Sequence, residues 1–352
     1  MAVQERSTEA FVGQALADLA ACYAGVMISS GHKLGLYQAL AGQGPVSSHE
    51  LAARAELDER YVREWLNSQV VGGYLAYHEE SETYELPAEH VPVLAEESSP
   101  VFLPPAFDIP ASMWFDQERI LEAFRTGEGV AWGEHDSRLQ HGIAVFYRNA
   151  YSATLVPEWL PALDGVVEKL ERGARVADIG TGHGHSTVLM AQAFERSRFV
   201  GLDTHGASID AARANAAEAG VAERVEFRVA DASTYAGSGF DLICFFDALH
   251  DFGDPIGAAR HAYEALADDG TLMLVEPFAG DSLLENVGTV GRLYYTASTA
   301  MCVPHSRSEG VGLALGAQAG PARLTAVLEE AGFRSVRVAH ESPFNLVLEA
   351  RR

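Results

Sequence analysis

The sequence predicts an α/β chain in which a helical N-terminal domain precedes a mostly parallel β-sheet that ends in one antiparallel hairpin. From about residue 166, short apolar runs alternate with segments of helical periodicity, which is typical of a parallel sheet covered by helices on both faces. The last two apolar runs, 334–340 and 345–350, are joined by a turn too short for anything but antiparallel neighbours. The N-terminal third shows helical periodicity without this alternation, so we expect a separate domain there.

Length and composition indicate a globular chain of two domains. The chain has 352 residues, of which 48% are hydrophobic, enough for two sizeable cores. It shows no secretory pattern at its start and no uninterrupted apolar run of about 18 residues, so neither export nor a membrane span is expected. Cys22, Cys244 and Cys302 lack metal-ligand spacing and are predicted to be reduced thiols in a cytoplasmic protein without a metal site.

The charge balance excludes one large class of partners. The formal net charge is −24, and acidic residues are spread along the chain rather than gathered in one block. Proteins that bind nucleic acids need clustered Lys and Arg to neutralise phosphates. We therefore expect a small-molecule partner rather than a nucleic acid.

The first 90 residues show three helices and a hairpin. Residues 9–30 are predicted to form a helix that is apolar on more than one face, which suggests burial against a partner subunit and hence a homodimer. A short helix follows, and Ser47 with Glu50 has the spacing of a capping box at the start of the next. Asp58 is placed to cap another helix, and residues 74–87 alternate as two strands around a polar turn. This order is the winged-helix pattern.

Acidic side chains argue against DNA binding by this domain. The helix that would enter the major groove carries Asp58, Glu59 and Glu64, and the turn between the two strands carries three more glutamates. Such a surface is repelled by phosphate groups. Dimerisation, and closure of one side of a substrate pocket, are the roles that we expect instead.

The chain divides into three predicted regions: a winged-helix dimerisation domain at 1–100, a helical linker at 101–165 and the α/β domain at 166–352. The linker begins with a proline-rich stretch and is then rich in aromatic side chains. A helical segment beside a ligand site commonly supplies pocket walls. Candidate substrate contacts in it are Trp114, Trp132, Tyr147 and Tyr151.

A glycine loop at 175–190 is the clearest ligand-binding signal. An apolar strand containing Asp178 leads into a turn whose candidate ligand contacts are Gly180, Thr181, Gly182 and Gly184, and then into a helix. A dinucleotide fingerprint needs a third glycine where this chain has His185. An acid two residues before the first glycine suits a ligand with an ammonium and a sulfonium group better than a pyrophosphate. The pattern resembles motif I of class I S-adenosylmethionine (SAM)-dependent methyltransferases.

Polar residues follow the next three strands at the edge where ligands bind in open α/β sheets. Asp203, with Thr204 beside it, is placed to accept hydrogen bonds from both ribose hydroxyls. Asp231 is placed to accept from the adenine amino group. The remaining candidate cofactor contacts at these strand ends are Ala232, Phe246 and Asp247.

The stretch from Ala248 to Pro277 extends the resemblance to the whole chain. With the winged helix, it resembles small-molecule O-methyltransferases of natural-product pathways and their bacterial relatives, and is similar to their H-D-W-x-D region and the strand after it. The resemblance implies a seven-stranded Rossmann-like domain, with His250 as the general base and Glu276 as the residue that orients it. Phe252 stands where the family has tryptophan. A second orienting glutamate is not evident, and Gln318 stands nearby.

Residues 278–320 are predicted to form a lid over the acceptor site. Arg292 and Tyr294 in this insertion, and Asp251 beside His250, are further candidate substrate contacts. Together Asp247, His250 and Asp251 offer ligands for a cation, but methyl transfer needs no metal and none is expected.

The sequence thus predicts a cytoplasmic, homodimeric, SAM-dependent methyltransferase that acts on a small molecule, with a hydroxyl as the acceptor and His250 as the base. An amine, thiol or carbon acceptor stays open, as does a rearrangement in which SAM has only a structural role. A different class of function, a winged-helix regulator that senses SAM without catalysis, is the alternative. A nucleic-acid methyltransferase is disfavoured because the fourth strand ends in Phe246-Asp247-Ala248-Leu249 rather than in an Asn/Asp-Pro-Pro-aromatic motif.

Overall fold

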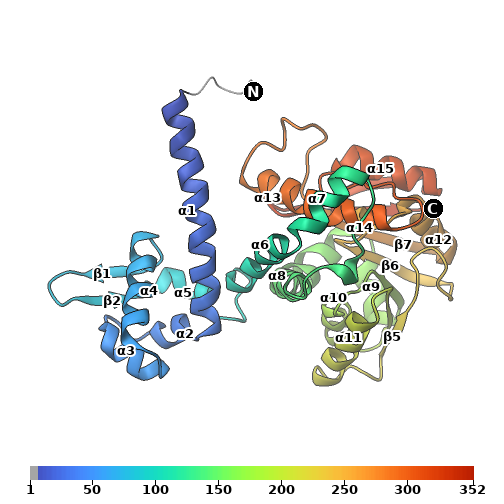
Figure 1. Ribbon diagram of the computed structural model, residues 1–352. Helices are drawn as coiled ribbons and strands as arrows, with labels where there is room; N and C mark the ends of the chain where they lie inside the picture. The colour runs from blue at the N-terminus through green and yellow to red at the C-terminus, as the bar shows by residue number, and fades with distance from the viewer. Residues whose placement is uncertain (1–6) are drawn as a thin grey trace. The chain divides into compact units, whose positions relative to one another are not determined.

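The computed structural model describes residues 7–352 and contains two compact units. The first unit comprises the described residues up to Trp114 together with Asp136–Ala150, and the second comprises Phe115–His135 and Tyr151–Arg352. Figure 1 colours the chain from the blue N-terminal helices to the red C-terminal elements.

The first unit is a helical domain with one small hairpin (Figure 1). Its main elements are α1 (Thr8–Lys33), α2 (Leu36–Leu40), α3 (Ser48–Ala55), α4 (Glu59–Val71), β1 (Ala76–His78), β2 (Thr83–Glu85), α5 (Val91–Leu94), α6 (Asp108–Phe115, up to Trp114) and the first part of α8 (Arg138–Thr154). The predicted order of helices followed by an antiparallel hairpin is confirmed.

Local capping explains where α3 and α4 begin. Ser47 and Glu50 form the predicted capping box, with the Ser47 hydroxyl accepting from the Glu50 N–H and the Glu50 carboxylate accepting from the Ser47 N–H. Asp58 accepts from two backbone N–H groups at the start of α4. The apolar face of α4 then buries Trp65, whose indole N–H donates to the Met27 carbonyl at 2.9 Å and so ties α4 to α1.

Most of helix α1 is uncovered within its own unit. Only Ile28 and Gly31 of this helix are buried, while its exposed large apolar residues are Phe11, Val12, Leu16, Leu19, Tyr23 and Val26. By length and composition alone, α1 is also apolar enough to cross a membrane, although a core helix of a soluble protein passes the same test. The expectation that no segment could span a membrane is therefore wrong for α1. Gln14 and Asp18 interrupt its apolar run, but its mean hydropathy stays high enough for a membrane-spanning helix.

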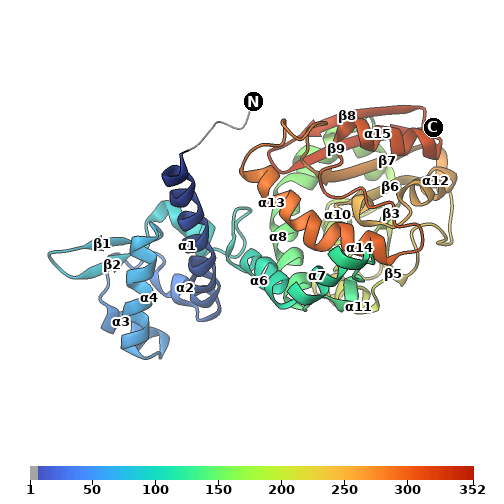
Figure 2. The same cartoon turned by 45° about the horizontal axis from the view of Figure 1, so that its top comes forward.

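The second unit is built on a seven-stranded sheet in the order β5-β4-β3-β6-β7-β9-β8 (Figure 2). The first five strands in this order run parallel, and β9 pairs antiparallel with both β7 and β8. The predicted fold class is therefore confirmed. The strands are β3 (Arg175–Ile179), β4 (Arg198–Asp203), β5 (Val225–Val229), β6 (Phe240–Phe246), β7 (Leu266–Pro277), β8 (Ser335–Glu341) and β9 (Asn345–Arg351).

One strand is longer than the sequence pattern predicts. The run Asp268-Asp269-Gly270 has the composition of a turn, so the sequence pattern predicts a strand only over 271–275. In the structure the chain is already extended from Leu266, which pairs with Phe240, and the ladder shifts register between Phe240 and Leu242. An irregular ladder of this kind lets turn-forming residues sit within a strand.

Helices pack against the strands of this sheet. The helices of the second unit are α7 (Gln117–Thr126), α9 (Val166–Arg172), α10 (His185–Ala193), α11 (Gly206–Glu218), α12 (Pro255–Ala265), α13 (Thr289–Ala297), α14 (Val303–Ser308) and α15 (Gly320–Ala331). α10 and α11 contact β4 and β5, whereas α12 and α15 contact each other and also β7 and β8, respectively. Between α13 and α14, Ser298–Cys302 forms one turn of π-helix, and α14 contacts the Leu249–Asp251 segment that follows β6.

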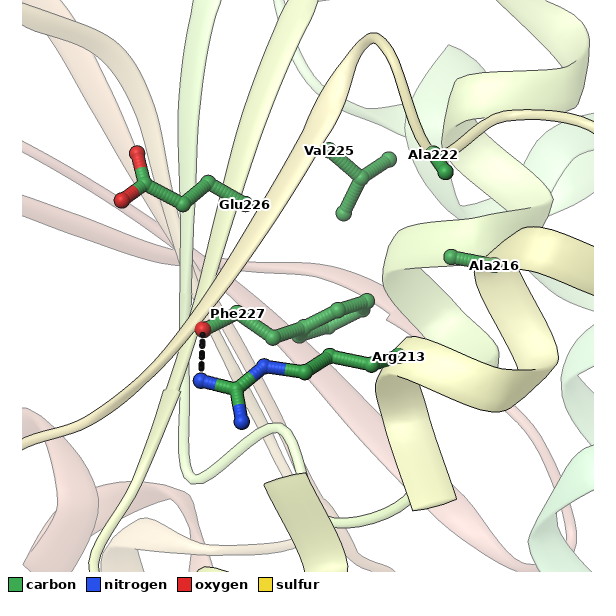
Figure 3. Close-up of a pocket in the computed structure, with 6 residues that line it drawn as sticks. All are labelled: Arg213, Ala216, Ala222, Val225, Glu226 and Phe227. Atoms are coloured by element: carbon green, nitrogen blue, oxygen red, sulfur yellow. Dashed lines mark hydrogen bonds between the residues drawn. The ribbon is translucent and has the colours of Figure 1, made fainter. Parts of the chain in front are cut away.

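A surface hollow of about 380 Å³ lies between α11 and the edge strand β5 (Figure 3). Arg213 lines it and donates a hydrogen bond to the Phe227 carbonyl at 2.9 Å. The other lining residues are Ala216, Ala222, Val225 and Glu226. The hollow meets β5 along its amino-terminal half, whereas ligands of open α/β sheets bind at the carboxyl ends, so we assign it no catalytic role.

Candidate active site at the carboxyl ends of the strands

Asp178, at the end of β3, is buried and holds the glycine loop in place. Its Oδ2 accepts hydrogen bonds from three hydroxyl groups, those of Thr181 at 3.0 Å, Ser186 at 2.6 Å and Thr187 at 2.5 Å. Burial raises the pKa of Asp178, and these three donors act in the opposite direction. Within residues 7–352, the buried Oδ1 has no hydrogen-bond partner. One carboxylate oxygen thus stays available to a donor from a ligand.

The three glycines of the loop have positive φ angles, which a residue with a Cβ adopts only under strain. They nevertheless differ in their surroundings. A Cβ on Gly182 would meet no atom within 4 Å, so there is open space over this glycine, three residues before the first residue of α10. A Cβ on Gly180 would lie 2.7 Å from the Cβ of Ala248. Gly180 therefore lets the loop after β3 pack against the segment after β6.

We expect Gly180→Ala to destabilise the second unit by about 1–3 kcal/mol, because it combines a strained φ angle with overpacking against Ala248. Chemical denaturation followed by circular dichroism measures this change. Gly206→Ala is the matched control, since Gly206 begins α11 with ordinary φ and a Cβ there would meet no atom within 4 Å. Equal unfolding free energies for the two variants would contradict the packing described here.

Asp203, at the end of β4, is joined to the glycine loop. Its Oδ2 accepts from the Gly182 N–H at 2.9 Å and its Oδ1 accepts from the His205 N–H at 2.8 Å. Each oxygen keeps a lone pair for a ligand hydroxyl. Asp231, after β5, is exposed and caps its own turn, with Oδ1 accepting from the Ser233 N–H at 2.7 Å. Thr204 and Ala232 follow these two acids directly.

These groups fit the charges and donors of SAM. The free oxygen of Asp178 is available to an ammonium group, and the open space at Gly182 lies in the loop that leads into the N-terminus of α10, where N–H groups favour a carboxylate. Asp203 offers the acceptors that ribose hydroxyls need. A pyrophosphate, by contrast, would bring negative charge towards two carboxylates.

Asp247, at the end of β6 beside Phe246, is held by protein groups in a strained conformation. Its φ angle is 48°, which is uncommon for a residue other than glycine. Its carboxylate accepts from the Tyr151 hydroxyl at 2.6 Å and from the Asn345 side-chain amide at 3.0 Å. Burial raises the pKa of Asp247 to about 7. Asn345 was missed from the sequence, where it is an ordinary polar residue after a turn.

His250 is buried and flanked by two carboxylates. Its Nδ1 forms a short hydrogen bond with the Glu276 side chain, and its backbone N–H donates to the other Glu276 oxygen at 3.3 Å. Its Nε2 lies 3.2 Å from Asp251 Oδ1. Burial by itself lowers the pKa of His250, but the charges of Asp251 and Glu276 outweigh it and raise the pKa well above the usual value. The structure thus brings together His250 and Glu276, as the family resemblance implied.

The second carboxylate near His250 comes from an unexpected residue. Gln318, which stands near the place of the family's second glutamate, donates to the backbone carbonyl of Phe278 at 3.0 Å. Asp251, which the sequence suggests as a substrate contact or a possible cation ligand, lies beside Nε2. Its position directly after the histidine gave no indication of this, because the local 3₁₀ turn that folds it back is not visible in the sequence.

The remaining predicted substrate contacts are divided between the two units. Trp114 and Tyr147 belong to the first unit. In the second unit, Tyr294 donates its hydroxyl to the Phe344 carbonyl at 2.9 Å, and the ring of Trp132 lies 5.7 Å from that of His305. Arg292 lies on α13. Tyr151 donates its hydroxyl to Asp247, a predicted cofactor contact, at 2.6 Å.

Two family profiles match the chain. Residues 21–96 match the Rv2258c-like winged HTH domain, and residues 170–332 match a methyltransferase domain. Among curated proteins, the chain is 32% identical over 123 residues to the uncharacterized methyltransferase YcgJ of Bacillus subtilis (strain 168). This match covers 34% of the chain and 47% of YcgJ, so the chain spans about half the length of the curated relative that it matches.

Solved structures resemble the chain over nearly its whole length. PigF with S-adenosylhomocysteine (SAH) has a TM-score of 0.75 at 17% identity and covers 99% of this chain and 100% of its own. The mitomycin 7-O-methyltransferase MmcR has a TM-score of 0.69 at 20% identity, with 98% and 99% covered. At these identities the likeness shows a shared fold. Together with the family profiles, it confirms the resemblance that the glycine loop and the His250 stretch predict.

Proposed function

We propose that this chain, which joins a winged helix-turn-helix domain to a class I SAM-dependent methyltransferase domain, transfers a methyl group to a hydroxyl group of a small molecule. The observation that carries the acceptor assignment is the buried pair of His250 and Glu276 at the end of β6. His250 lies in the segment after β6, which packs against the glycine loop where Ala248 meets Gly180. This neighbourhood supports the assignment of His250 as the proton acceptor.

Different residues are assigned to cofactor binding and to proton transfer in such a reaction. SAM supplies an activated methyl group when it is bound. Asp178 and the glycine loop would hold the ammonium and carboxylate groups of its amino-acid part, and Asp203 would orient the ribose. In its neutral form, His250 takes the proton from the acceptor hydroxyl at Nε2, while Glu276 fixes the orientation of the ring and stabilises the imidazolium that forms. Burial of both side chains excludes water from this step.

The acceptor class is testable with one labelled cofactor. Purified protein is incubated with methyl-labelled SAM and a panel of small aromatic compounds that bear a hydroxyl, an amine or a thiol on the same ring. We expect label only in the hydroxyl compounds, since a positioned base matters most for an acceptor that must lose its proton. MmcR, a 7-O-methyltransferase by name, has the same fold and supports a hydroxyl as the first choice. Label confined to amines would contradict the proposal.

Ion pairs on the winged helix argue against the alternative function of a DNA-binding regulator. On α4, Arg60 pairs with Glu64 at 2.5 Å and Arg63 pairs with Glu59 at 3.4 Å. The basic side chains of this helix are thus partnered by carboxylates on the same helix. Contacts with DNA phosphates would have to break both pairs and overcome the remaining negative charge.

We also propose that α1 mediates a homodimer. Five of its exposed apolar residues, Val12, Leu16, Leu19, Tyr23 and Val26, follow one another at alternating spacings of four and three. This is the pattern of a helix seam that packs against another helix. A second copy of α1 offers the same seam, and a symmetric pair of helices would remove both from water.

Leu16→Glu with Leu19→Glu should convert the dimer into a monomer, because it places two charges in the apolar seam. Size-exclusion chromatography with light scattering gives the mass directly. Ala21→Glu is the control, since Ala21 is exposed on the opposite side of α1. A dimer that persists in the double variant would contradict the role of the seam, and a wild-type protein that needs detergent to stay in solution would favour membrane contact instead.

A further inference from the structure

Three different metal-ligating side chains meet beside the proposed base. His250 and Asp251 come from the turn after β6, and Cys302 comes from the π-helix turn before α14. One ligand atom from each lies within 4.8 Å of the other two. Nε2 of His250 and Oδ1 of Asp251 are 3.2 Å apart, close to the roughly 3.3–3.8 Å that separates two ligands bound tetrahedrally at about 2.0–2.3 Å from one metal ion.

The surroundings of these atoms are those of a metal site. A histidine that binds a metal through one nitrogen nearly always donates the other ring N–H to a carboxylate or carbonyl. Glu276 holds Nδ1 of His250 in this way and directs Nε2 towards Asp251 and Cys302. In the described part of the chain, Oδ1 of Asp251 is buried without a hydrogen-bond partner. Cys302 is buried as well.

We propose that His250, Asp251 and Cys302 bind one Zn²⁺ ion and leave its fourth coordination position open. Nitrogen, oxygen and sulfur ligands together suit zinc, whereas Mg²⁺ and Ca²⁺ prefer oxygen alone. Three protein ligands with an open position form the type of site that binds a water molecule or an exchangeable ligand. The sequence suggests His250 and Asp251 as possible cation ligands, but not Cys302, which lies in a different part of the chain.

Zinc at this position would switch off the proposed reaction. The ion occupies Nε2 of His250, the atom that is assigned to take the proton from the acceptor. Binding forms the zinc–sulfur and zinc–nitrogen bonds and releases to solvent the thiol proton of Cys302 and the Nε2 proton of the His250 imidazolium, with no change in oxidation state. This consequence rests on the proposed function, whereas zinc binding itself does not.

Calorimetric titration of the chelator-treated full chain with zinc chloride tests the site. We expect one Zn²⁺ per chain in the wild type, and at least 100-fold weaker binding in Cys302→Ser. Glu276→Gln should weaken binding about 10- to 100-fold. Cys22→Ser is the matched control, since Cys22 is exposed on α1 and should leave the affinity unchanged. Equal zinc affinity in wild type and Cys302→Ser would overturn the proposal.

Cobalt gives a readout that does not depend on activity. Co²⁺ added to the wild type should produce a thiolate-to-cobalt charge-transfer band that is absent from Cys302→Ser, and cobalt bound without this band would contradict a sulfur ligand. SAH binding by Cys302→Ser would show that this variant is folded. If Cys302→Ser does not fold, Asp251→Asn takes its place in these experiments. Zn²⁺ should slow wild-type methyl transfer at least tenfold and that of Cys302→Ser less than twofold, each relative to its own metal-free rate. A protein that binds zinc but transfers no methyl group would contradict the proposed function alone.

Discussion

His250→Ala should lower kcat for a hydroxyl acceptor by about 10²–10⁴-fold, the usual contribution of a positioned acid or base. The imidazole is the group assigned to remove the acceptor proton, and Glu276 supports the charge that it gains. The affinity for SAH should change less than twofold, because the cofactor contacts are assigned to Asp178, Asp203 and the glycine loop. Initial rates at saturating SAM, together with calorimetric titration of SAH, separate the two effects.

His49→Ala is the control for this experiment, since His49 is an exposed residue of α3. It should leave both turnover and SAH affinity unchanged. A His250→Ala variant whose kcat stays within threefold of the wild type would show that the base is another residue, or that the acceptor needs none. Loss of SAH binding in the same variant would instead indicate a structural role.

Asp203→Ala should weaken SAH binding by about 30- to 1,000-fold, which corresponds to about 2–4 kcal/mol. The carboxylate is assigned two charge-assisted hydrogen bonds from the ribose hydroxyls, and each such bond contributes about 1.5–3 kcal/mol to the binding free energy. It also accepts the Gly182 N–H and so holds the glycine loop. Calorimetric titration with SAH measures the change.

Asp210→Ala separates this effect from a general loss of negative charge. Asp210 lies on α11 and forms an exposed ion pair with Arg213 at 2.9 Å. The variant should bind SAH with wild-type affinity. An unchanged affinity in folded Asp203→Ala protein would contradict the assignment of the ribose to the end of β4.

Sequence reasoning succeeded where local patterns decide the structure. The capping residues Ser47 and Asp58 act on backbone groups two or three positions away, so their helices begin as predicted. The glycine loop is likewise local, because its positive φ angles depend on the glycines themselves. The pairing of His250 with Glu276 is not local, and only the resemblance to a known family suggested it.

Contacts between distant segments had no signal in the sequence. Asn345 and Tyr151 both donate to Asp247, and Cys302 reaches the His250 turn from another helix. Such contacts depend on how β6, β9 and the π-helix turn are brought together by the fold. The exposure of α1 is a related case, since apolar periodicity predicts that a helix face is covered but does not say by what.

The central claim is that the glycine loop after β3 binds SAM rather than a dinucleotide. Calorimetric titration of the wild-type chain with SAH and, separately, with NADH tests it most directly. We expect micromolar binding of SAH with one site per chain and no measurable binding of NADH. Binding of NADH, or of neither ligand by folded protein, would contradict it.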